Sequence, residues 1–228
     1  MSRKSTDLSW AVRLDGRALW TRNAVPKQQV YGESLRRFKG EEWRRWEPHR
    51  SKLGAALLRC KTDSQELLPE PGSTILYLGA GHGTSVSHIH DHLCGENNSK
   101  GGRLVAVDLA PRCLRDLTHL ARSRKGLVPV LGDARNFDTW GVLVPKRVNW
   151  LFQDVAQAGQ VKIFLAACER FLAEGGIGML SLKGASERVG DDSVFDAAEN
   201  ELIINGREVI ERINLKGFED QHVVFLIR

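Results

Sequence analysis

Short apolar runs, bounded by glycine or polar residues, recur along most of this chain. Such runs are typical of strands that are buried on both faces of a parallel sheet. Between them, apolar residues recur at helical spacing instead. We therefore expect strands and helices to alternate. The expected strands span residues 74–78, 104–109, 127–131, 148–154 and 178–183, and the expected helices span residues 85–93, 113–123 and 161–172.

The last part of the chain predicts a change of strand direction. A helical pattern over residues 191–204 precedes two apolar strands, at 208–215 and 222–227. The link between these strands is too short for a crossover helix, so we expect them to pair antiparallel. The prediction is an α/β fold with a mostly parallel sheet whose last strand is antiparallel. By fold analogy, this is the Rossmann-like sheet of class I methyltransferases.

The first fifty residues follow a different pattern. Residues 11–14 and 18–21 are predicted as short strands joined by the turn signal Asp15-Gly16, and a helix is expected over 51–58. Four of the six tryptophans lie in this part of the chain. We favour a small local core over base stacking as their role. They are Trp10, Trp20, Trp43 and Trp46.

Positive charge is concentrated at the front of the chain. Residues 1–53 hold 13 Lys and Arg against 6 Asp and Glu, a balance of +7, whereas residues 54–228 hold 20 against 22, a balance of −2. This asymmetry favours a polyanionic partner, although a solvated surface explains it too. We predict a small basic β-rich N-terminal domain over residues 1–53 and, over residues 54–228, an α/β domain whose predicted sheet resembles that of the methyltransferases.

The composition argues against several classes of protein. Hydrophobic residues make up 42% and charged residues 27%, as in ordinary globular proteins, and no run of about 18 apolar residues predicts a membrane span. His88 and His92 share one helical face while His90 points away, so we expect solvated or capping histidines and no bound metal. Scattered cysteines favour reduced thiols of a cytosolic protein over disulfides or zinc. They are Cys60, Cys94, Cys113 and Cys168.

A glycine-rich turn closes the first strand of the α/β region. It runs from Leu78 to Thr84 and contains Gly79, Gly81 and Gly83. Glycine removes Cβ atoms, so that a ligand can contact the backbone at a helix N-terminus. A dinucleotide fingerprint needs glycine where Thr84 stands, whereas the observed spacing suits S-adenosylmethionine. A tight turn without a ligand is the alternative.

Acidic side chains follow the next two strands. Asp108 ends the second strand, where a carboxylate can accept hydrogen bonds from both ribose hydroxyls of an adenosine cofactor. Asp133 follows the third strand, where it can accept from the adenine amino group while the backbone at Ala134 meets the ring. Either carboxylate can instead cap the next helix. Together with the glycine turn, the two acids predict S-adenosylmethionine as the cofactor.

Three further polar residues are expected at the same edge of the sheet. Asp154 and Lys183 end the fourth and fifth strands, and His222 starts the final antiparallel strand. In a doubly wound sheet, the carboxyl ends of these strands border one crevice. Lys183 follows an apolar strand and needs a partner, for which Asp154 is the nearest candidate. The three residues predict the site of methyl transfer, with a structural ion pair as the alternative.

With these motifs in place, the chain resembles the fibrillarins, which are box C/D RNA 2′-O-methyltransferases, from about Thr21 to the C-terminus. Three strings are distinctive: Tyr31-Gly-Glu33, Arg50-Ser-Lys-Leu53 and Asp154-Val-Ala-Gln157. No glycine/arginine-rich tail precedes them, which favours the archaeal form. Further matches are Thr21-Arg-Asn-Ala-Val-Pro26, Ile75-Leu-Tyr-Leu-Gly-Ala80, Val86-Ser-His88, Arg115-Asp-Leu117 and Asp133-Ala-Arg135.

The resemblance implies a catalytic tetrad and a set of cofactor contacts. The family's Lys-Asp-Lys-His tetrad matches Lys52, Asp154, Lys183 and His222, which adds Lys52 to the residues above. The implied cofactor-binding residues are Gly79, Ala80, Gly83, Thr84, Asp108, Asp133, Ala134, Asp154 and Gln157.

The chain departs from the family pattern in the cofactor turn and after the second strand. Asp108 stands where Glu is usual, and Gly81-His82 stand where Ala-Ser or a similar pair is usual. The resemblance also implies partners: a box C/D guide RNA, a target RNA, a Nop-type scaffold protein and a kink-turn-binding protein, with no membrane. For an archaeal-type protein we expect a cytoplasmic location, and a nucleolar one only in a eukaryote.

These features predict an RNA-guided ribose 2′-O-methyltransferase that processes rRNA and tRNA as the catalytic subunit of a box C/D ribonucleoprotein. Lys183 is the candidate for general base or for orienting the hydroxyl. We expect Asp154 to hold Lys183 and the methyl end of the cofactor. We expect His222 and Lys52 to orient the ribose or a neighbouring phosphate.

Two other readings of the function remain open. One is a methyltransferase that acts on a base, on a protein glutamine or on a small molecule. The string after the fourth strand, Asp154-Val-Ala-Gln157, lacks the Asn/Asp-Pro-Pro-aromatic pattern of many base methyltransferases, which argues against a base. The other is an RNA-binding subunit without catalytic activity, which a measured absence of cofactor binding would favour.

Overall fold

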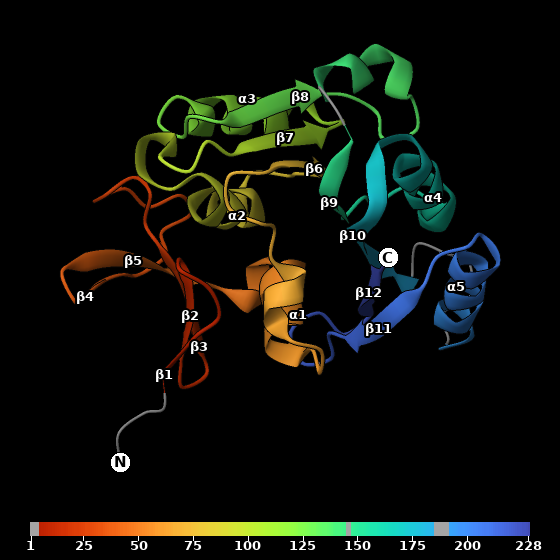
Figure 1. Ribbon diagram of the computed structural model, residues 1–228, viewed down its shortest axis with the longest axis horizontal. Coiled ribbons are helices and arrows are strands. Elements are labelled where there is room, and N and C mark those ends of the chain that lie inside the picture. Colours follow the sequence, from red (N-terminus) through yellow and green to blue (C-terminus); the bar gives the residue numbers. More distant parts are fainter. Residues whose placement is uncertain (1–4, 145–146, 185–191) are drawn as a thin grey trace.

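The computed structural model describes residues 5–144, 147–184 and 192–228, and two sheets organise them (Figure 1). The strands of the larger sheet are β6 (Thr74–Leu78), β7 (Arg103–Asp108), β8 (Leu127–Leu131), β9 (Val148–Gln153), β10 (Leu172–Lys183), β11 (Val209–Asn214) and β12 (His222–Ile227). They lie in the order β11-β12-β10-β9-β6-β7-β8. β12 pairs antiparallel with both β10 and β11, and all other pairs in this sheet are parallel, which confirms the predicted sheet.

Helices cover both faces of this sheet. They are α1 (Lys52–Arg59), α2 (Thr84–Cys94), α3 (Pro111–Ala121), α4 (Gln160–Phe171) and α5 (Asp192–Ile204). The buried side chains of α1, α2 and α3 form one core on one face, and those of α4 and α5 form a second core on the other. The predicted helix ends agree to within two residues, and residue 191, the expected start of the last helix, lies outside the described residues.

One strand is longer than the sequence pattern predicts. β10 begins at Leu172 rather than at residue 178. Leu172 pairs with Val148, and the register then shifts before Ile177 pairs with Trp150. Gly175, with φ of +68°, lies in the shifted stretch, where glycine adopts left-handed backbone without a Cβ clash. The predicted strand at 178–183 is therefore the second part of a longer strand that contains an irregularity between Leu172 and Ile177.

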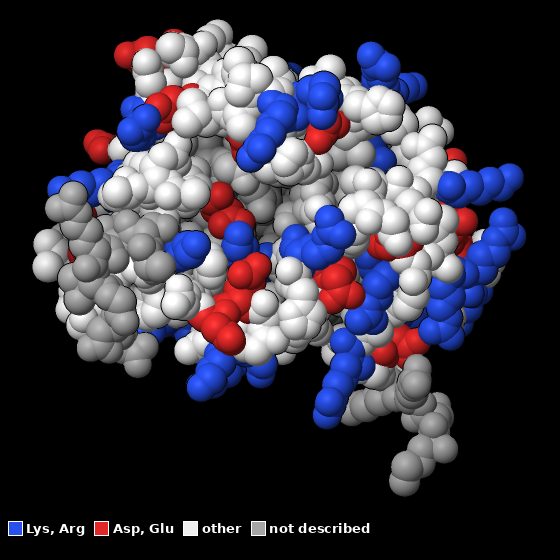
Figure 2. Space-filling model, turned by 180° about the vertical axis from the view of Figure 1, so that it is seen from behind, with Lys and Arg blue, Asp and Glu red and all other residues white. Residues whose placement is uncertain are grey.

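The smaller sheet lies on the N-terminal side of the molecule, where many Lys and Arg side chains gather (Figure 2). Its strands are β1 (Ser5–Asp7), β2 (Val12–Asp15), β3 (Ala18–Arg22), β4 (Leu35–Phe38) and β5 (Glu41–Trp46), in the order β1-β2-β3-β5-β4. Asp15 pairs with Ala18 across the turn, which confirms the predicted hairpin.

The expected local tryptophan core is not what the structure shows. Trp46 is fully buried, and its ring stacks on His88 of α2 with centroids 4.8 Å apart. Leu19 and Leu53 lie in the same core cluster, which joins the small sheet to α1, α2 and the large sheet. Trp20 remains partly exposed on the other side of the small sheet. A five-stranded sheet of short strands buries its inner face by docking rather than by folding on itself.

The three histidines of α2 are buried, not solvated as expected. His88 contacts the Tyr31 hydroxyl at 2.8 Å and the Thr21 hydroxyl at 3.0 Å. His90 bonds to the carbonyl of Lys125, and His92 to that of Pro69 and to the Ser9 hydroxyl. Helix α2 lies between the two sheets, so even its polar side faces protein. Burial lowers the pKa of His92 to about 4 and that of His88 well below its usual value, so both are neutral at pH 7.

A buried ion-pair cluster joins the small sheet to α2. The Arg44 guanidinium donates to Glu33 at 2.6 Å, to Asp91 at 2.5 Å and to the Ser87 hydroxyl at 2.9 Å. Arg124 donates to the other oxygen of Asp91 at 3.1 Å. Burial opposes ionisation of Asp91, but Arg124 and Arg44 hold its pKa well below the usual range. The cluster ties the basic N-terminal segment to the helix that starts at the glycine turn.

Among the described residues, no three His, Cys, Asp or Glu side chains are grouped so that they could hold a metal ion. Within the same residues, no helix combines the length and the apolar character that crossing a bilayer requires.

Candidate functional site

A cavity of about 630 Å³ lies where β6, β7, β8 and β9 end. This is the edge at which the parallel strands have their carboxyl ends. It lies beside the point where the strand order switches from one side of β6 to the other. Doubly wound sheets bind their ligands at such a point. The volume is in the range of small-molecule and cofactor sites. The described lining residues are Lys52, Gly79, Gly81, Val107, Asp108, Leu109, Ala110, Gly132, Ala134, Asp154, Val155, Ala156 and Gln157.

The glycine turn shapes one wall of this cavity. Gly79 has φ of +79°, and a Cβ there would collide with the backbone carbonyl of Asp154. Gly81 has φ of +57°, and a Cβ there would meet no atom within 4 Å. Gly79 thus allows β6 and β9 to approach each other, and Gly81 leaves bare backbone at the cavity. Gly83 ends the turn as the residue before α2.

Asp108 is held in place by two backbone amides. Its carboxylate accepts from the N–H of Gly81 at 2.7 Å and from the N–H of Ala110 at 2.8 Å. The shorter side chain that replaces the family's usual Glu is therefore drawn toward the glycine turn, and it still lines the cavity. A carboxylate fixed in this way has lone pairs left for the hydroxyls of a ribose.

Asp133 has a different position from the one expected. Its carboxylate is held by Arg135 through its Nε at 3.0 Å and its Nη2 at 2.6 Å, and it does not line the cavity. The Trp140 indole donates to the Asp133 carbonyl at 2.9 Å, and a Cβ on Gly132 would lie 2.5 Å from the Trp140 ring. The backbone at Gly132 and Ala134 therefore borders the cavity, while the Asp133 side chain points to Arg135.

Lys52, which only the family resemblance indicated, forms the ion pair that was expected of Lys183. Lys52 Nζ lies 3.1 Å from Asp154 Oδ2, and both side chains are about a quarter exposed or less. Among the described residues, the cation that contacts Asp154 is Lys52 and not Lys183, which corrects the sequence-based pairing. Ser51 starts α1 by accepting from the Gly54 N–H at 3.1 Å. A Cβ on Gly54 would lie 2.8 Å from the Trp46 ring, so this glycine lets α1 pack closely.

Lys183 and His222 face each other across the antiparallel pair of β10 and β12. Side chains directly opposite in such a pair have Cβ atoms about 5 Å apart. The Lys183 N–H donates to the side-chain oxygen of the buried Gln160 at 3.2 Å, which fixes the end of β10. Burial and the nearby Lys52 lower the pKa of His222, against the pull of Asp154. The four tetrad residues therefore meet at one place, and His222 is neutral at pH 7.

The structure assembles most, but not all, of the predicted cofactor residues. Gly79, Asp108, Ala134, Asp154 and Gln157 line the cavity with Lys52. Ala80 and Gly83 are buried in the turn and do not line the cavity, and Thr84 opens α2. Sequence reasoning missed several lining residues, although each lies within two residues of the end of a predicted strand. They are Val107, Leu109, Ala110, Gly132, Val155 and Ala156.

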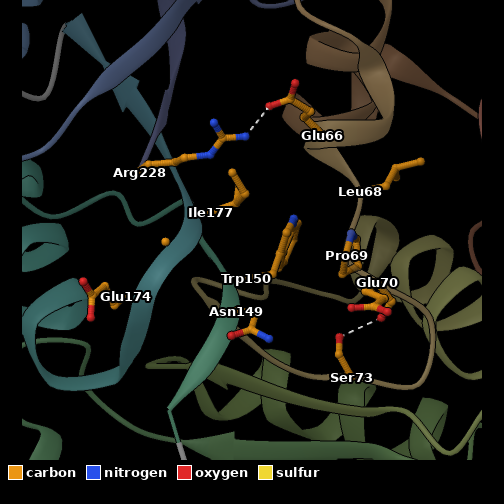
Figure 3. A pocket seen from close by; sticks show the side chains of 11 residues that line it. Glu66, Leu68, Pro69, Glu70, Ser73, Asn149, Trp150, Glu174, Ile177 and Arg228 are labelled. Atoms are coloured by element: carbon orange, nitrogen blue, oxygen red, sulfur yellow. Dashed lines mark hydrogen bonds and ion pairs between the residues drawn. The ribbon is translucent and has the colours of Figure 1, made fainter.

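A second cavity, of about 440 Å³, lies at the opposite, amino-terminal edge of the large sheet (Figure 3). The Trp150 side chain lies between its walls, and Arg228 pairs with Glu66 at 2.8 Å on one side. Of the described residues that line it, none belongs to the predicted site. The carboxyl-edge cavity is therefore the candidate active site.

Comparison with known proteins places this site in a family. The family model described as Fibrillarin matches residues 3–228. A fibrillarin-like rRNA/tRNA 2′-O-methyltransferase of Thermococcus onnurineus is 43% identical over 210 residues, which cover 91% of this chain and 88% of the relative.

Solved structures agree with the family model. The fibrillarin of Aeropyrum pernix, in complex with natively bound S-adenosyl-L-methionine, has a TM-score of 0.85 and 34% identity, and the match covers 100% of this chain and 98% of the other. The chain matched in a fibrillarin/Nop5p complex has a TM-score of 0.83 and 28% identity, with 97% and 99% covered. Together with the strand-end site described above, these matches show that the chain belongs to the fibrillarin family.

Proposed function

We propose that this protein transfers a methyl group from S-adenosylmethionine to a ribose 2′-hydroxyl of rRNA or tRNA, as the RNA-guided catalytic subunit of a box C/D ribonucleoprotein. The observation that carries the proposal is the meeting of Lys52, Asp154, Lys183 and His222 beside the strand-end cavity. The relatives support the choice of acceptor, because the T. onnurineus protein is named a 2′-O-methyltransferase of rRNA and tRNA.

The residues of the cavity fit the proposed cofactor. Gly81 leaves open space where a Cβ would project, and Asp108 is fixed with lone pairs available for a diol. Leu109, which follows β7 directly, is 51% exposed and lines the cavity, where an apolar side chain can cover a base. We propose that Asp108 holds the ribose and that the backbone at Ala134 borders the adenine. When bound, S-adenosylmethionine supplies an electrophilic sulfonium methyl group.

The chain's own residues then align the acceptor and manage one proton. We propose that the Lys52–Asp154 pair fixes the Asp154 carboxylate at the methyl end of the cavity. The acceptor oxygen forms a bond to the methyl carbon as the sulfur–methyl bond breaks, and its proton leaves to a base of the chain. Lys183 and the neutral His222 are the two groups placed to orient the hydroxyl and take that proton.

The proposed partners follow from family membership and from one solved complex. A related chain was crystallised with Nop5p, which supports a Nop-type scaffold protein as a partner. We propose a box C/D guide RNA and a kink-turn-binding protein as the other components. In such an assembly the guide RNA selects the target nucleotide, so this chain needs no base-reading residues of its own.

A methylation assay with tritiated cofactor tests the proposal. The protein is assembled with scaffold protein, kink-turn-binding protein and guide RNA, and given a target RNA with either a 2′-hydroxyl or a 2′-deoxy sugar at the guided nucleotide. We expect label only on the 2′-hydroxyl target and only with the matching guide. Label on the 2′-deoxy target would overturn the ribose assignment, and no label on either would overturn the enzymatic function.

A further inference from the structure

A third cavity shares a wall with the candidate active site. It has a volume of about 440 Å³ and lies on the other side of the glycine turn. In two segments of the chain, closely spaced residues line different cavities. Arg50 lines this cavity and Lys52 the active site, and His82 lines this cavity and Gly81 the active site.

The shared wall is thin and well anchored. Ser51, which separates Arg50 from Lys52, contacts the Ser85 hydroxyl at 2.8 Å. This contact joins the start of α1 to the first turn of α2. Only Ser51 therefore separates Arg50, which lines the third cavity, from Lys52 of the Lys52–Asp154 pair.

Basic groups converge in the third cavity. The Arg50 guanidinium lies over the Tyr31 ring, 5.0 Å from its centroid, and His82 and His119 enter from the turn and from α3. The one acid among the described lining residues is Asp116, and it is already engaged by His82 at 2.7 Å and by Arg115 at 3.2 Å. The cavity therefore has no unpaired carboxylate among those residues to repel an anion.

A second arginine, Arg124, lines the same cavity. This side chain is 1% exposed, and its Nη2 atom is buried without a hydrogen-bond partner. Its Nε donates to Asp91, whose other oxygen is taken by Arg44. This buried guanidinium group adds positive charge to the wall of the cavity, but it has almost no surface that a ligand could contact. The group that an anion in the cavity can contact is therefore Arg50, whose side chain is exposed.

We infer that this cavity is a phosphate-binding subsite for the RNA backbone, which holds a phosphate of the target strand close to the methylated ribose through Arg50, with the positive charge of Arg124 behind it. The inference rests on the proposed function, because it takes the strand in the active site to be RNA. Guanidinium groups pair well with phosphate oxygens, and phosphate contacts position a nucleic acid without reading its sequence. That is the task of an enzyme whose target is chosen by a guide RNA.

Substituting Arg50 tests the subsite, because Arg50 is exposed and its loss leaves the buried cluster intact. In the assembled enzyme with guide RNA, we expect Arg50→Gln to raise the KM for target RNA about five- to tenfold, and Arg50→Glu to raise it further. The KM for S-adenosylmethionine and kcat should stay within about twofold of wild type. Arg17→Gln, which removes another exposed arginine, from the β2–β3 turn, is the matched control and should change none of these values.

Neutral phosphate analogues identify the ligand more sharply. Each target RNA carries a methylphosphonate in place of one phosphate. In each of these RNAs, the 2′-hydroxyl next to the replaced phosphate is already methylated. At one position near the target, we expect the methylphosphonate to weaken binding of the RNA to the wild-type enzyme about five- to tenfold. At the same position it should hardly change binding to Arg50→Gln. Such non-additive effects would show that this phosphate and Arg50 interact directly. The dependence of affinity on salt should also become shallower in Arg50→Gln.

Two results would overturn the inference while leaving the proposed function intact. One is an unchanged KM for target RNA in Arg50→Gln and Arg50→Glu, with methyl transfer normal. The other is purely additive effects of Arg50→Gln at every methylphosphonate position, which would mean that Arg50 acts only through general charge. If wild-type enzyme transfers no methyl group, the proposed function fails, and the inference fails with it.

Discussion

Lys52 Nζ and Asp154 Oδ2 lie 3.1 Å apart, and this contact joins the first helix of the chain to the end of the fourth strand of the large sheet. Lys52 is the first residue of α1, and Asp154 directly follows β9. Among the described residues, Asp154 forms no other ion pair. The pair connects the front of the chain to the candidate active site. It also places a positive charge close enough to His222 to lower the pKa of that residue.

We expect Lys52→Gln to reduce kcat by more than tenfold with little loss of stability. The pair is partly exposed, and exposed pairs contribute at most about 1 kcal/mol, so the free energy of unfolding should change by less than about 1 kcal/mol. The check is steady-state methyl transfer together with chemical denaturation. Lys162→Gln, on the exposed side of α4, is the matched control and should keep both values. Near-normal kcat in Lys52→Gln would remove Lys52 from the tetrad.

The pKa of His222 should respond to Lys52. Burial and Lys52 both lower it, so removing the positive charge in Lys52→Gln should raise the pKa toward the ordinary value of about 6.5. The measurement is an NMR titration of the His222 ring protons in the cofactor-free protein. In the assembled enzyme, the acid limb of the pH–rate profile should move to higher pH in the same variant. A downward shift in either measurement would contradict the electrostatic arrangement described here.

The lowered pKa of His222 has a second consequence, for stability. The folded protein binds this proton less readily than the unfolded chain, whose pKa is about 6.5. The His222 contribution to stability is therefore present above pH 6.5 and is lost as the pH falls through the window down to the folded pKa. Urea denaturation of wild type and His222→Gln should show free energies of unfolding that fall more steeply below pH 6.5 in wild type. Parallel pH curves for the two proteins would count against a lowered pKa.

Neighbouring arginines on β5 should differ sharply in their effect on stability. Arg44 is fully buried with Glu33 and Asp91, and Arg44→Ala removes the guanidinium group that pairs with both carboxylates. We therefore expect the free energy of unfolding to fall by about 3–5 kcal/mol. Arg45 points to the other face and lies 3.9 Å from Glu47, so Arg45→Ala should cost less than about 1 kcal/mol. Denaturation by urea measures both. Similar losses in the two variants would mean that the buried cluster does not hold the sheets together.

Gly79→Ala should disrupt the cofactor site. Its backbone is left-handed, which costs alanine about 1 kcal/mol, and the new Cβ would also collide with the Asp154 carbonyl. Gly40→Ala is the control, because Gly40 has a similar φ of +84° but open space around it. We expect Gly40→Ala to lower stability by about 1 kcal/mol and to keep cofactor affinity. Gly79→Ala should weaken cofactor binding at least tenfold in calorimetry, and equal affinities in the two variants would contradict this role.

The division into domains at residue 53 stays a prediction. The small sheet ends at Trp46 and α1 begins at Lys52, close to the predicted boundary. Yet Leu19, Trp46 and Leu53 lie in one core cluster with residues of the large sheet. A composition change marks where the strand pattern changes, but it does not reveal whether the two parts bury a common surface.

The sequence alone determined the order of strands and helices, the glycine turn and the edge at which the functional side chains meet. These follow from local rules: buried parallel strands are apolar throughout, and residues at the carboxyl ends of such strands share one edge. The tertiary structure decided which partner each charged group takes. Asp154 pairs with Lys52 rather than Lys183, Asp133 with Arg135, and the α2 histidines with carbonyls and hydroxyls of distant segments. Apolar periodicity reports which side of an element is buried, whereas ion pairs and hydrogen bonds depend on how elements far apart in the chain pack together.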